Sequence, residues 1–274
     1  MAMNFTLQDT ALRTRGLGIR FGAFQAVNEV NLDLEPGARQ ALIGPNGAGK
    51  TTLINLLTGV YRPTSGSIHL GGHDVTEQSA DRRARAGMAR TFQINTLFPS
   101  LTPLLSVVLA ICERDGLGGQ WWKPLQWHKP IYTEAHALLD RLRLSPLAHT
   151  PVTELAYGKQ RLLEIALALA AKPRILLLDE PAAGIPAGES SELFEVIAEL
   201  PADISVLFIE HDMNLVFRFA RRISVLVAGE ILTEGTPREI STDPRVRDVY
   251  LGHRTNKMAQ GACLLYTSDA ADEE

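Results

Sequence analysis

Cysteine is nearly absent from this sequence, with only Cys112 and Cys263 among 274 residues. Two cysteines cannot build the disulfide framework of a small secreted domain, and no group of cysteines and histidines has the spacing of a metal site. The sequence also lacks the run of about 18 apolar residues that a membrane-spanning helix needs, and residues 1–10 lack the basic-then-apolar order of a secretory signal. We therefore expect a cytosolic chain whose only metal would arrive with a bound nucleotide.

The net charge says nothing about partners, because four acids near the carboxyl end account for all of the formal charge of −4. Residues 263–274 are similar to the in-frame translation of a transposase adapter used in preparing shotgun DNA libraries. We interpret them as a read-through product, the alternative being a disordered acidic tail. The four acids are Asp269, Asp272, Glu273 and Glu274.

Hydrophobic patterning predicts an α/β protein. Residues 12–20 and 30–34 alternate as antiparallel edge strands do, whereas residues 38–44, 175–178, 204–209 and 223–228 are short and apolar, as buried strands are. Helical patterns separate the later strands, at residues 162–171, 190–200 and 213–220, so we expect a mainly parallel sheet covered on both faces. Residues from 94 to about 150 have helical periodicity and are interpreted as an inserted helical lobe.

A glycine-rich loop is the strongest local signal. It follows the strand-like run 41–43 and precedes a helix-compatible run at 53–57, which is the context of a phosphate-binding loop. Its glycines allow successive backbone N–H groups to face one concavity, and the helix after it adds the positive end of its dipole. Lys50 is expected to reach the β and γ phosphates and Thr51 to offer its hydroxyl to Mg²⁺. The loop comprises Gly44, Pro45, Asn46, Gly47, Ala48, Gly49, Lys50, Thr51 and Thr52.

Polar residues at the ends of three strands are the candidate catalytic groups. Asp179 and Glu180 end one buried strand, and since neighbouring strand residues point to opposite sides, they should have different roles. We assign Asp179 to Mg²⁺ and Glu180 to orienting or deprotonating the attacking water. His211 and Gln93 follow two further strands, the histidine to contact the γ-phosphate and water, the amide to reach Mg²⁺ or water. Spacing alone leaves a structural role open for both.

Taken together and in this order, the motifs resemble those of ATP-binding cassette (ABC) transporter ATPases, over residues 12 to about 252. The resemblance identifies Gly44 to Thr52 as Walker A, Gln93 as the Q-loop, residues 155–161 as the signature, residues 175–180 as Walker B and His211 as the switch histidine. It implies a P-loop NTPase fold of the RecA-like type, with ATP and Mg²⁺ as cofactors. Phe21, which lies 29 residues before Lys50, matches the aromatic that stacks on adenine, although a lone phenylalanine is commonly a core residue.

The resemblance also implies that two cassettes pair head to tail, as a homodimer or a heterodimer, with each ATP between one Walker A and the other signature. The signature is expected to begin a helix from Leu162 onward, whose amino end faces the γ-phosphate of the partner's ATP. Tyr157 and Gly158 are the signature residues expected to bind nucleotide. Ala156 and Lys159 depart from the usual signature, so phosphate contact would rest on backbone N–H groups and the Lys159 ammonium.

Two further expectations concern residue 186 and the domain boundaries. Pro186 stands where the family has an aspartate that signals between sites, so we expect weakened or rerouted communication. We expect one ABC ATPase domain over residues 1–256, with a core at about 1–93 and 160–240, a helical subdomain at about 94–159, and a tail at 257–262.

Several motifs are similar to those of ATPase subunits of importers for branched-chain and other hydrophobic amino acids. They include Tyr157, residues 179–184, the run 89–93 with 97–99, and residues 209–213. The resemblance implies two transmembrane permease subunits, a second ATPase subunit and, indirectly, a periplasmic solute-binding protein, with no nucleic acid. It places the chain peripherally on the cytoplasmic face of a bacterial inner membrane.

Other classes remain open at this stage. Importers of urea or short amides and lipopolysaccharide exporters have similar cassettes, and a soluble ABC ATPase acting on DNA or ribosomes would share the motifs. A small-molecule kinase or GTPase would share only Walker A. Trp121, Trp122 and Trp127 are either part of a docking surface for the permeases or, as the more common reading, core residues of the helical lobe.

Overall fold

The computed structural model describes residues 10–91, 97–117 and 129–250. Gln93, the three tryptophans at 121, 122 and 127, the expected tail at 257–262 and residues 263–274, interpreted as read-through, lie outside the described residues. The assignments made for them therefore stay predictions.

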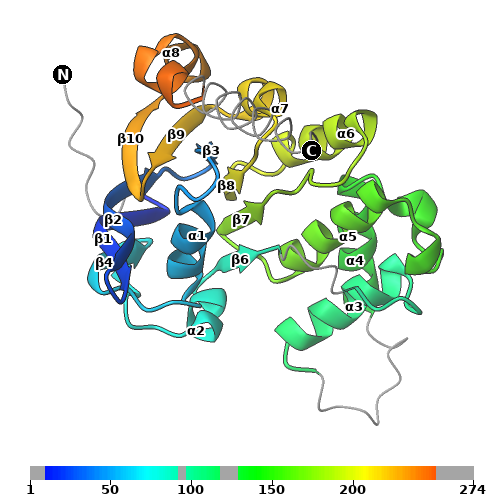
Figure 1. Cartoon of the computed structure of the whole chain (residues 1–274). Helices are drawn as coiled ribbons and strands as arrows, with labels where there is room; N and C mark the ends of the chain where they lie inside the picture. The colour runs from blue at the N-terminus through cyan, green and yellow to red at the C-terminus, as the bar shows by residue number, and fades with distance from the viewer. Residues whose placement is uncertain (1–9, 92–96, 118–128, 251–274) are drawn as a thin grey trace, which may run out of the picture.

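A six-stranded sheet forms the centre of the molecule (Figure 1). Its order is β10-β9-β3-β8-β7-β6, and all pairs are parallel except β9 with β10. The three middle strands are buried along their whole length, which explains their short apolar sequences. The strands are β3 (Arg39–Ile43), β6 (Met88–Arg90), β7 (Ile175–Asp179), β8 (Ser205–Ile209), β9 (Arg222–Val227) and β10 (Glu230–Gly235).

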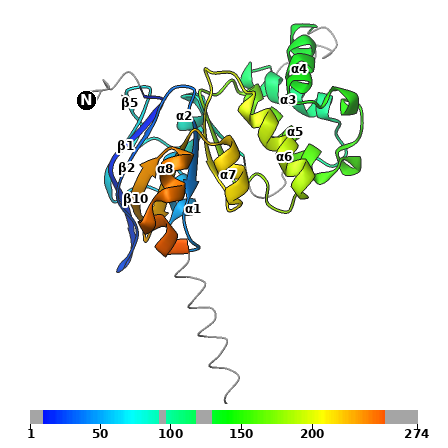
Figure 2. The same ribbon diagram turned by 90° about the horizontal axis from the view of Figure 1, so that it is seen from above.

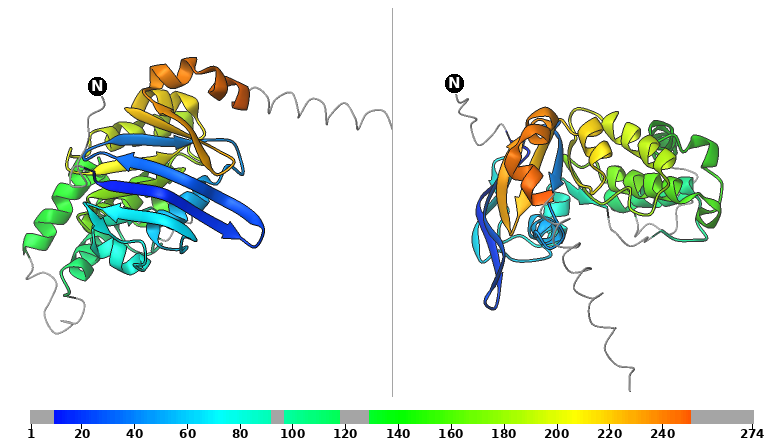
Figure 3. Two further views of the ribbon diagram at one scale, coloured as in Figure 1. Left: turned by 90° about the vertical axis from the view of Figure 1, so that its left-hand side faces the viewer. Right: turned by 45° about the horizontal axis from the view of Figure 1, so that its top comes forward.

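A second, antiparallel sheet has the order β2-β1-β4-β5 and carries the long hairpin that projects in Figure 3. Helix α1 (Lys50–Thr58) lies between the two sheets, because Leu53, Ile54, Leu56 and Leu57 belong to one buried cluster with residues of both. The hairpin turns at residues 22–23, and a second turn at residues 36–37 leads from β2 into β3 of the central sheet. The strands are β1 (Leu12–Phe21), β2 (Phe24–Leu34), β4 (Ser65–Leu70) and β5 (His73–Asp74).

The helices on the other side of the central sheet form a second layer and a lobe (Figure 2). Helices α3, α4 and α5 pack against one another, and α5 also contacts α6. These helices are α3 (Pro103–Arg114), α4 (Lys129–Arg141), α5 (Tyr157–Ala170), α6 (Ala187–Ala198) and α7 (Met213–Phe219), with short 3-10 turns at Ser145–Leu147 and Val152–Glu154. Helix α8 (Pro237–Thr242) contacts β9 and β10, and α2 (Ala80–Arg85) lies beside α1. Among the described residues, no helix is long and apolar enough to span a bilayer.

Two helices differ from expectation. Helix α5 begins at Tyr157 and not at Leu162, because Gly158, Arg161 and Leu162 are already buried on the face that packs into the protein. Helix α8 was not predicted, although a capping box signals it: Thr236 accepts the Glu239 N–H, and Glu239 accepts the Thr236 N–H. The predicted fold class is confirmed, with a mainly parallel sheet, an antiparallel subdomain and a helical lobe.

Candidate active site

The phosphate loop joins β3 to α1, as the sequence predicts. Gly49 has a φ of 101°, and a Cβ built there would lie 2.5 Å from the Ala26 carbonyl oxygen. Gly44 is equally confined, since its Cβ would come within 2.1 Å of the Leu226 carbonyl oxygen. These two positions therefore require glycine, one for its conformation and both for close backbone approach.

Lys50 is folded back over this loop. Its Nζ donates hydrogen bonds to the carbonyl oxygens of Gly44 at 2.8 Å and Pro45 at 3.0 Å, and only 7% of the residue is exposed. Burial lowers the pKa of the ammonium, while the carboxylates of Glu180 and Asp179 oppose that shift. The lysine is thus a cation held inside the loop by neutral acceptors, and an anionic ligand would be a stronger partner.

The two acids at the end of β7 lie in different environments. Asp179 has a side chain that is fully buried, and burial raises its pKa, which a hydrogen bond from Arg90 opposes. Its Oδ2 accepts from Arg90 Nη2 at 2.9 Å, whereas its Oδ1 is buried with no partner among the described residues. Glu180 is half-buried and has a φ of 50°, a left-handed conformation that is unusual for a residue with a side chain.

Glu180 and His211 form a pair. Strands β7 and β8 are hydrogen-bonded neighbours, so the residues that follow them meet at the carboxyl edge of the sheet. Glu180 Oε1 lies 2.8 Å from His211 Nε2. The structure thus brings together two residues that the sequence offered as separate candidates.

Glu210 is a residue whose contribution the sequence did not indicate. Its buried carboxylate accepts the backbone N–H of Ala182 at 2.8 Å and of His211 at 3.1 Å, and burial raises its pKa. It therefore holds the turns after both strands in place. The only sequence signal was an acid at the end of an apolar strand, next to the histidine.

A cavity of about 450 Å³ contains the phosphate loop, Glu180 and His211. Phe24, which is 65% exposed, also lines it. Phe21 lies at the end of β1 with its ring edge-to-face against Tyr61, at a centroid distance of 5.5 Å, and is not among the residues that line this cavity. Phe24 is therefore a second candidate for contact with the base, and the role of Phe21 stays a prediction.

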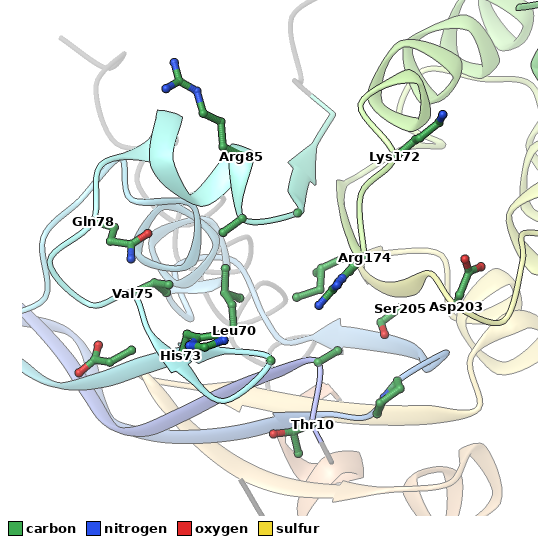
Figure 4. Close-up of a pocket in the computed structure, with 17 residues that line it drawn as sticks. Thr10, Leu70, His73, Val75, Gln78, Arg85, Lys172, Arg174, Asp203 and Ser205 are labelled. Atoms are coloured by element: carbon green, nitrogen blue, oxygen red, sulfur yellow. The ribbon is translucent and has the colours of Figure 1, made fainter. Parts of the chain in front are cut away.

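A larger cavity, of about 820 Å³, lies elsewhere (Figure 4). Its lining includes Leu70, Ile175 and Ser205, which are the last residue of β4 and the first residues of β7 and β8. It therefore lies at the amino edge of the central sheet, opposite the edge that carries Glu180 and His211. Ligands of open α/β sheets bind at the carboxyl edge, so size does not make this cavity the active site.

The residues beside the loop fit a magnesium ion that arrives with a nucleotide. Within the described ranges no three acids, histidines or cysteines are grouped to hold a metal alone. The buried Oδ1 of Asp179, which has no hydrogen-bond partner among the described residues, is nevertheless a hard oxygen of the kind that Mg²⁺ prefers. Together with the Thr51 hydroxyl it offers protein ligands to an ion whose other ligands would come from phosphates and water.

The signature residues lie in the first turn of α5, and two acids of α6 already engage them. The Gly158 N–H donates to Glu189 Oε2 at 3.1 Å, and Lys159 Nζ lies 2.7 Å from Glu192 Oε1. The Arg161 guanidinium lies over the Tyr157 ring, 4.9 Å from its centroid. The groups expected to face phosphate are thus occupied by carboxylates of the same chain.

A phosphate loop, a buried acid, and a Glu–His pair on neighbouring parallel strands together define a P-loop nucleoside triphosphatase. Residues 27–183 match the ABC transporter family, and residues 230–255 match the family described as branched-chain amino acid ATP-binding cassette transporter. The chain therefore belongs to the ABC transporter family, as an ATP-binding ATPase subunit.

Individual relatives agree with this assignment. The high-affinity branched-chain amino acid transport ATP-binding proteins BraF of Pseudomonas aeruginosa and LivG of Escherichia coli K12 are 40% and 42% identical to this chain. Each match covers 88% of the chain and 97% of the relative. The crystal structure of the ADP conformation of MJ1267, an ATP-binding cassette of an ABC transporter, superposes with a TM-score of 0.78 and 31% identity, over 89% of this chain and 99% of that one.

Proposed function

We propose that this protein hydrolyses MgATP to drive uptake of branched-chain or other hydrophobic amino acids through partner permeases. The observation that carries the catalytic part is the Glu180–His211 pair in the same cavity as the phosphate loop. Similarity to BraF and LivG over nearly their whole length supports the cargo class.

Each residue of the site has a distinct role in this proposal. Loop N–H groups and Lys50 bind the phosphates, and Lys50 exchanges its two carbonyl partners for phosphate oxygens. Glu180 orients or deprotonates the attacking water, and His211, held by Glu180, contacts the γ-phosphate. A bound Mg²⁺, held by Thr51 and Asp179 and by Gln93 in the undescribed segment, would neutralise phosphate charge.

The other half of the site would come from a second ATPase subunit, identical or not, packed head to tail. Its Tyr157 and Gly158 would face the γ-phosphate bound by Lys50 of the first subunit. Helix α5 would direct the positive end of its dipole at that phosphate, and the Gly158 N–H would reach it once Glu189 has moved away. Two permease subunits and, through them, a periplasmic binding protein would complete a transporter on the cytoplasmic face of the membrane, with the helical lobe at 94–159 contacting the permeases.

Glu189 should oppose closure of the dimer of ATPase subunits. Its carboxylate occupies the Gly158 N–H that the γ-phosphate needs, so closing the dimer requires the carboxylate to leave. We expect Glu189→Gln to strengthen ATP-dependent dimerisation roughly fivefold, because a charge at a helix amino terminus contributes about 1 kcal/mol. Analytical ultracentrifugation of the Glu180→Gln background with ATP would measure this.

The matched control is Glu195→Gln, on the same helix, where the acid pairs with Arg143 and Arg218 on the surface. Its dimerisation constant should stay within twofold of the parent protein. Weaker dimerisation in Glu189→Gln would show that the carboxylate supports the closed state and does not compete with phosphate.

Cargo-dependent ATP hydrolysis tests the proposed function. The chain is reconstituted in membranes with its permeases and a binding protein, and hydrolysis is measured with leucine, with urea, with lipopolysaccharide and with none of them. We expect leucine to stimulate hydrolysis and urea to have no effect. Stimulation by urea alone would assign the chain to an amide importer, and hydrolysis stimulated by lipopolysaccharide, with no response to leucine, would assign it to export.

A further inference from the structure

Arg90 connects helix α1, which follows the phosphate loop, to strand β7, which ends in Asp179. It is the last residue of β6, which pairs in parallel with β7. Its Nη1 donates to Asn55 Oδ1 at 2.7 Å, and its Nη2 donates to Asp179 Oδ2 at 2.9 Å. One guanidinium thus connects α1 with the end of β7.

This contact is enclosed. The Arg90 side chain is 13% exposed and that of Asp179 is fully buried, so water does not compete strongly for either group. The planar fork of a guanidinium fixes the direction of both hydrogen bonds, which a lysine ammonium does not do. The orientation of the Asp179 carboxylate is therefore set by Arg90.

The consequence concerns the other carboxylate oxygen. Because Arg90 engages Oδ2, the buried Oδ1 is left without a partner among the described residues. Asn55 follows Thr51 by four residues on α1, so these two side chains lie on the same face of the helix. By holding Asn55 and Asp179 together, Arg90 also fixes the distance between the helix that carries Thr51 and the strand that carries Asp179.

We propose that Arg90 is a positioning residue for the cation: it holds Asp179 so that Oδ1, together with the Thr51 hydroxyl, is directed to the metal that accompanies ATP. The inference rests on the proposed assignment of Asp179 as a metal ligand. A positioning role for Arg90 differs from that of a purely structural ion pair in one respect. A structural pair would affect stability and nucleotide binding generally, whereas a positioning residue affects the metal specifically.

Metal binding without turnover tests this inference. Mn²⁺ is titrated into the full-length protein with saturating ADP, and free Mn²⁺ is measured by electron paramagnetic resonance. ADP affinity is measured separately in EDTA. For Arg90→Met we expect roughly tenfold weaker Mn²⁺ binding, the usual effect of removing a group that orients a metal ligand, with metal-free ADP affinity within twofold of wild type.

Three further variants make the result decisive. Arg90→Lys keeps the charge but not the fork, so it should restore only part of the Mn²⁺ affinity, and it is the variant to use if Arg90→Met folds poorly. Arg85→Met, which removes an arginine from an exposed ion pair with Asp81, should behave as wild type. Asp179→Asn should lose Mn²⁺ affinity more severely than either Arg90 variant.

The outcomes separate the inference from the proposed function. Wild-type Mn²⁺ affinity in both Arg90 variants, with loss in Asp179→Asn, would overturn the role of Arg90 alone. Wild-type affinity in Asp179→Asn would overturn the metal assignment on which the proposal rests. If Arg90→Lys lost metal-free ADP binding as strongly as Mn²⁺ binding, Arg90 would be a structural residue.

Discussion

Replacing Glu180 by glutamine should stop ATP hydrolysis while ATP stays bound. The amide keeps the size of the side chain but cannot accept the proton of the attacking water. Loss of a general base slows hydrolysis by about a hundredfold to ten-thousandfold. The phosphate loop and Lys50 are untouched, so binding should persist. With hydrolysis blocked, the ATP-bound dimer should accumulate.

Steady-state hydrolysis and size-exclusion chromatography with ATP would measure the two effects. Glu77→Gln is the control, since this acid pairs with Arg62 on the surface. His211→Ala removes the residue that contacts Glu180 and should also reduce hydrolysis, with ATP binding retained. Unimpaired hydrolysis by Glu180→Gln with its partners present would show that the water is activated by another group.

Replacing Lys50 by alanine should abolish tight ATP binding, with a loss in affinity of roughly a hundredfold. The Lys50 ammonium is buried, and it is the one cation that the phosphate loop contributes to the cavity lined by the loop, Glu180 and His211. Truncating one partner of a buried, hydrogen-bonded charge pair costs about 3 kcal/mol, or roughly a hundredfold in affinity. Fluorescence titration with a nucleotide analogue would measure the loss.

Lys172→Ala is the matched control, because this lysine is largely exposed and pairs with Glu134. It should bind nucleotide as wild type does. The two lysine variants should also melt within a few degrees of each other without nucleotide, since Lys50 holds only its own loop. Affinity within twofold of wild type in Lys50→Ala would contradict the assignment of the loop.

The sequence was most informative for features formed by residues that are close together along the chain. Short apolar strands, the glycine loop and the acids that end β7 all follow from residues that are neighbours in sequence. Different environments for Asp179 and Glu180 were also predictable, because adjacent residues of a strand face opposite sides, although β7 ends at Asp179 and Glu180 lies just after it. The fold class could therefore be predicted before any contact was known.

Contacts between distant segments could not be predicted in this way. The partners of Gly158 and Lys159 are 31 and 33 residues away, and Arg90 lies 89 residues from Asp179. Nothing local marks Glu189 or Glu192 as anything but solvated acids at the start of a helix. The start of α5 was misplaced for a similar reason, since burial of its first turn depends on neighbours that the sequence does not reveal.

The proposed coupling of this site to transport is tested most directly by leucine uptake. Proteoliposomes contain the permeases and either the wild-type chain or the Glu180→Gln variant. ATP is supplied on the side of the membrane where this subunit is bound, and leucine-loaded binding protein is supplied on the opposite side. We expect ATP-dependent accumulation of labelled leucine with the wild-type chain and none above background with Glu180→Gln. Equal accumulation with both chains, or none with the wild-type chain in an intact complex, would contradict the account.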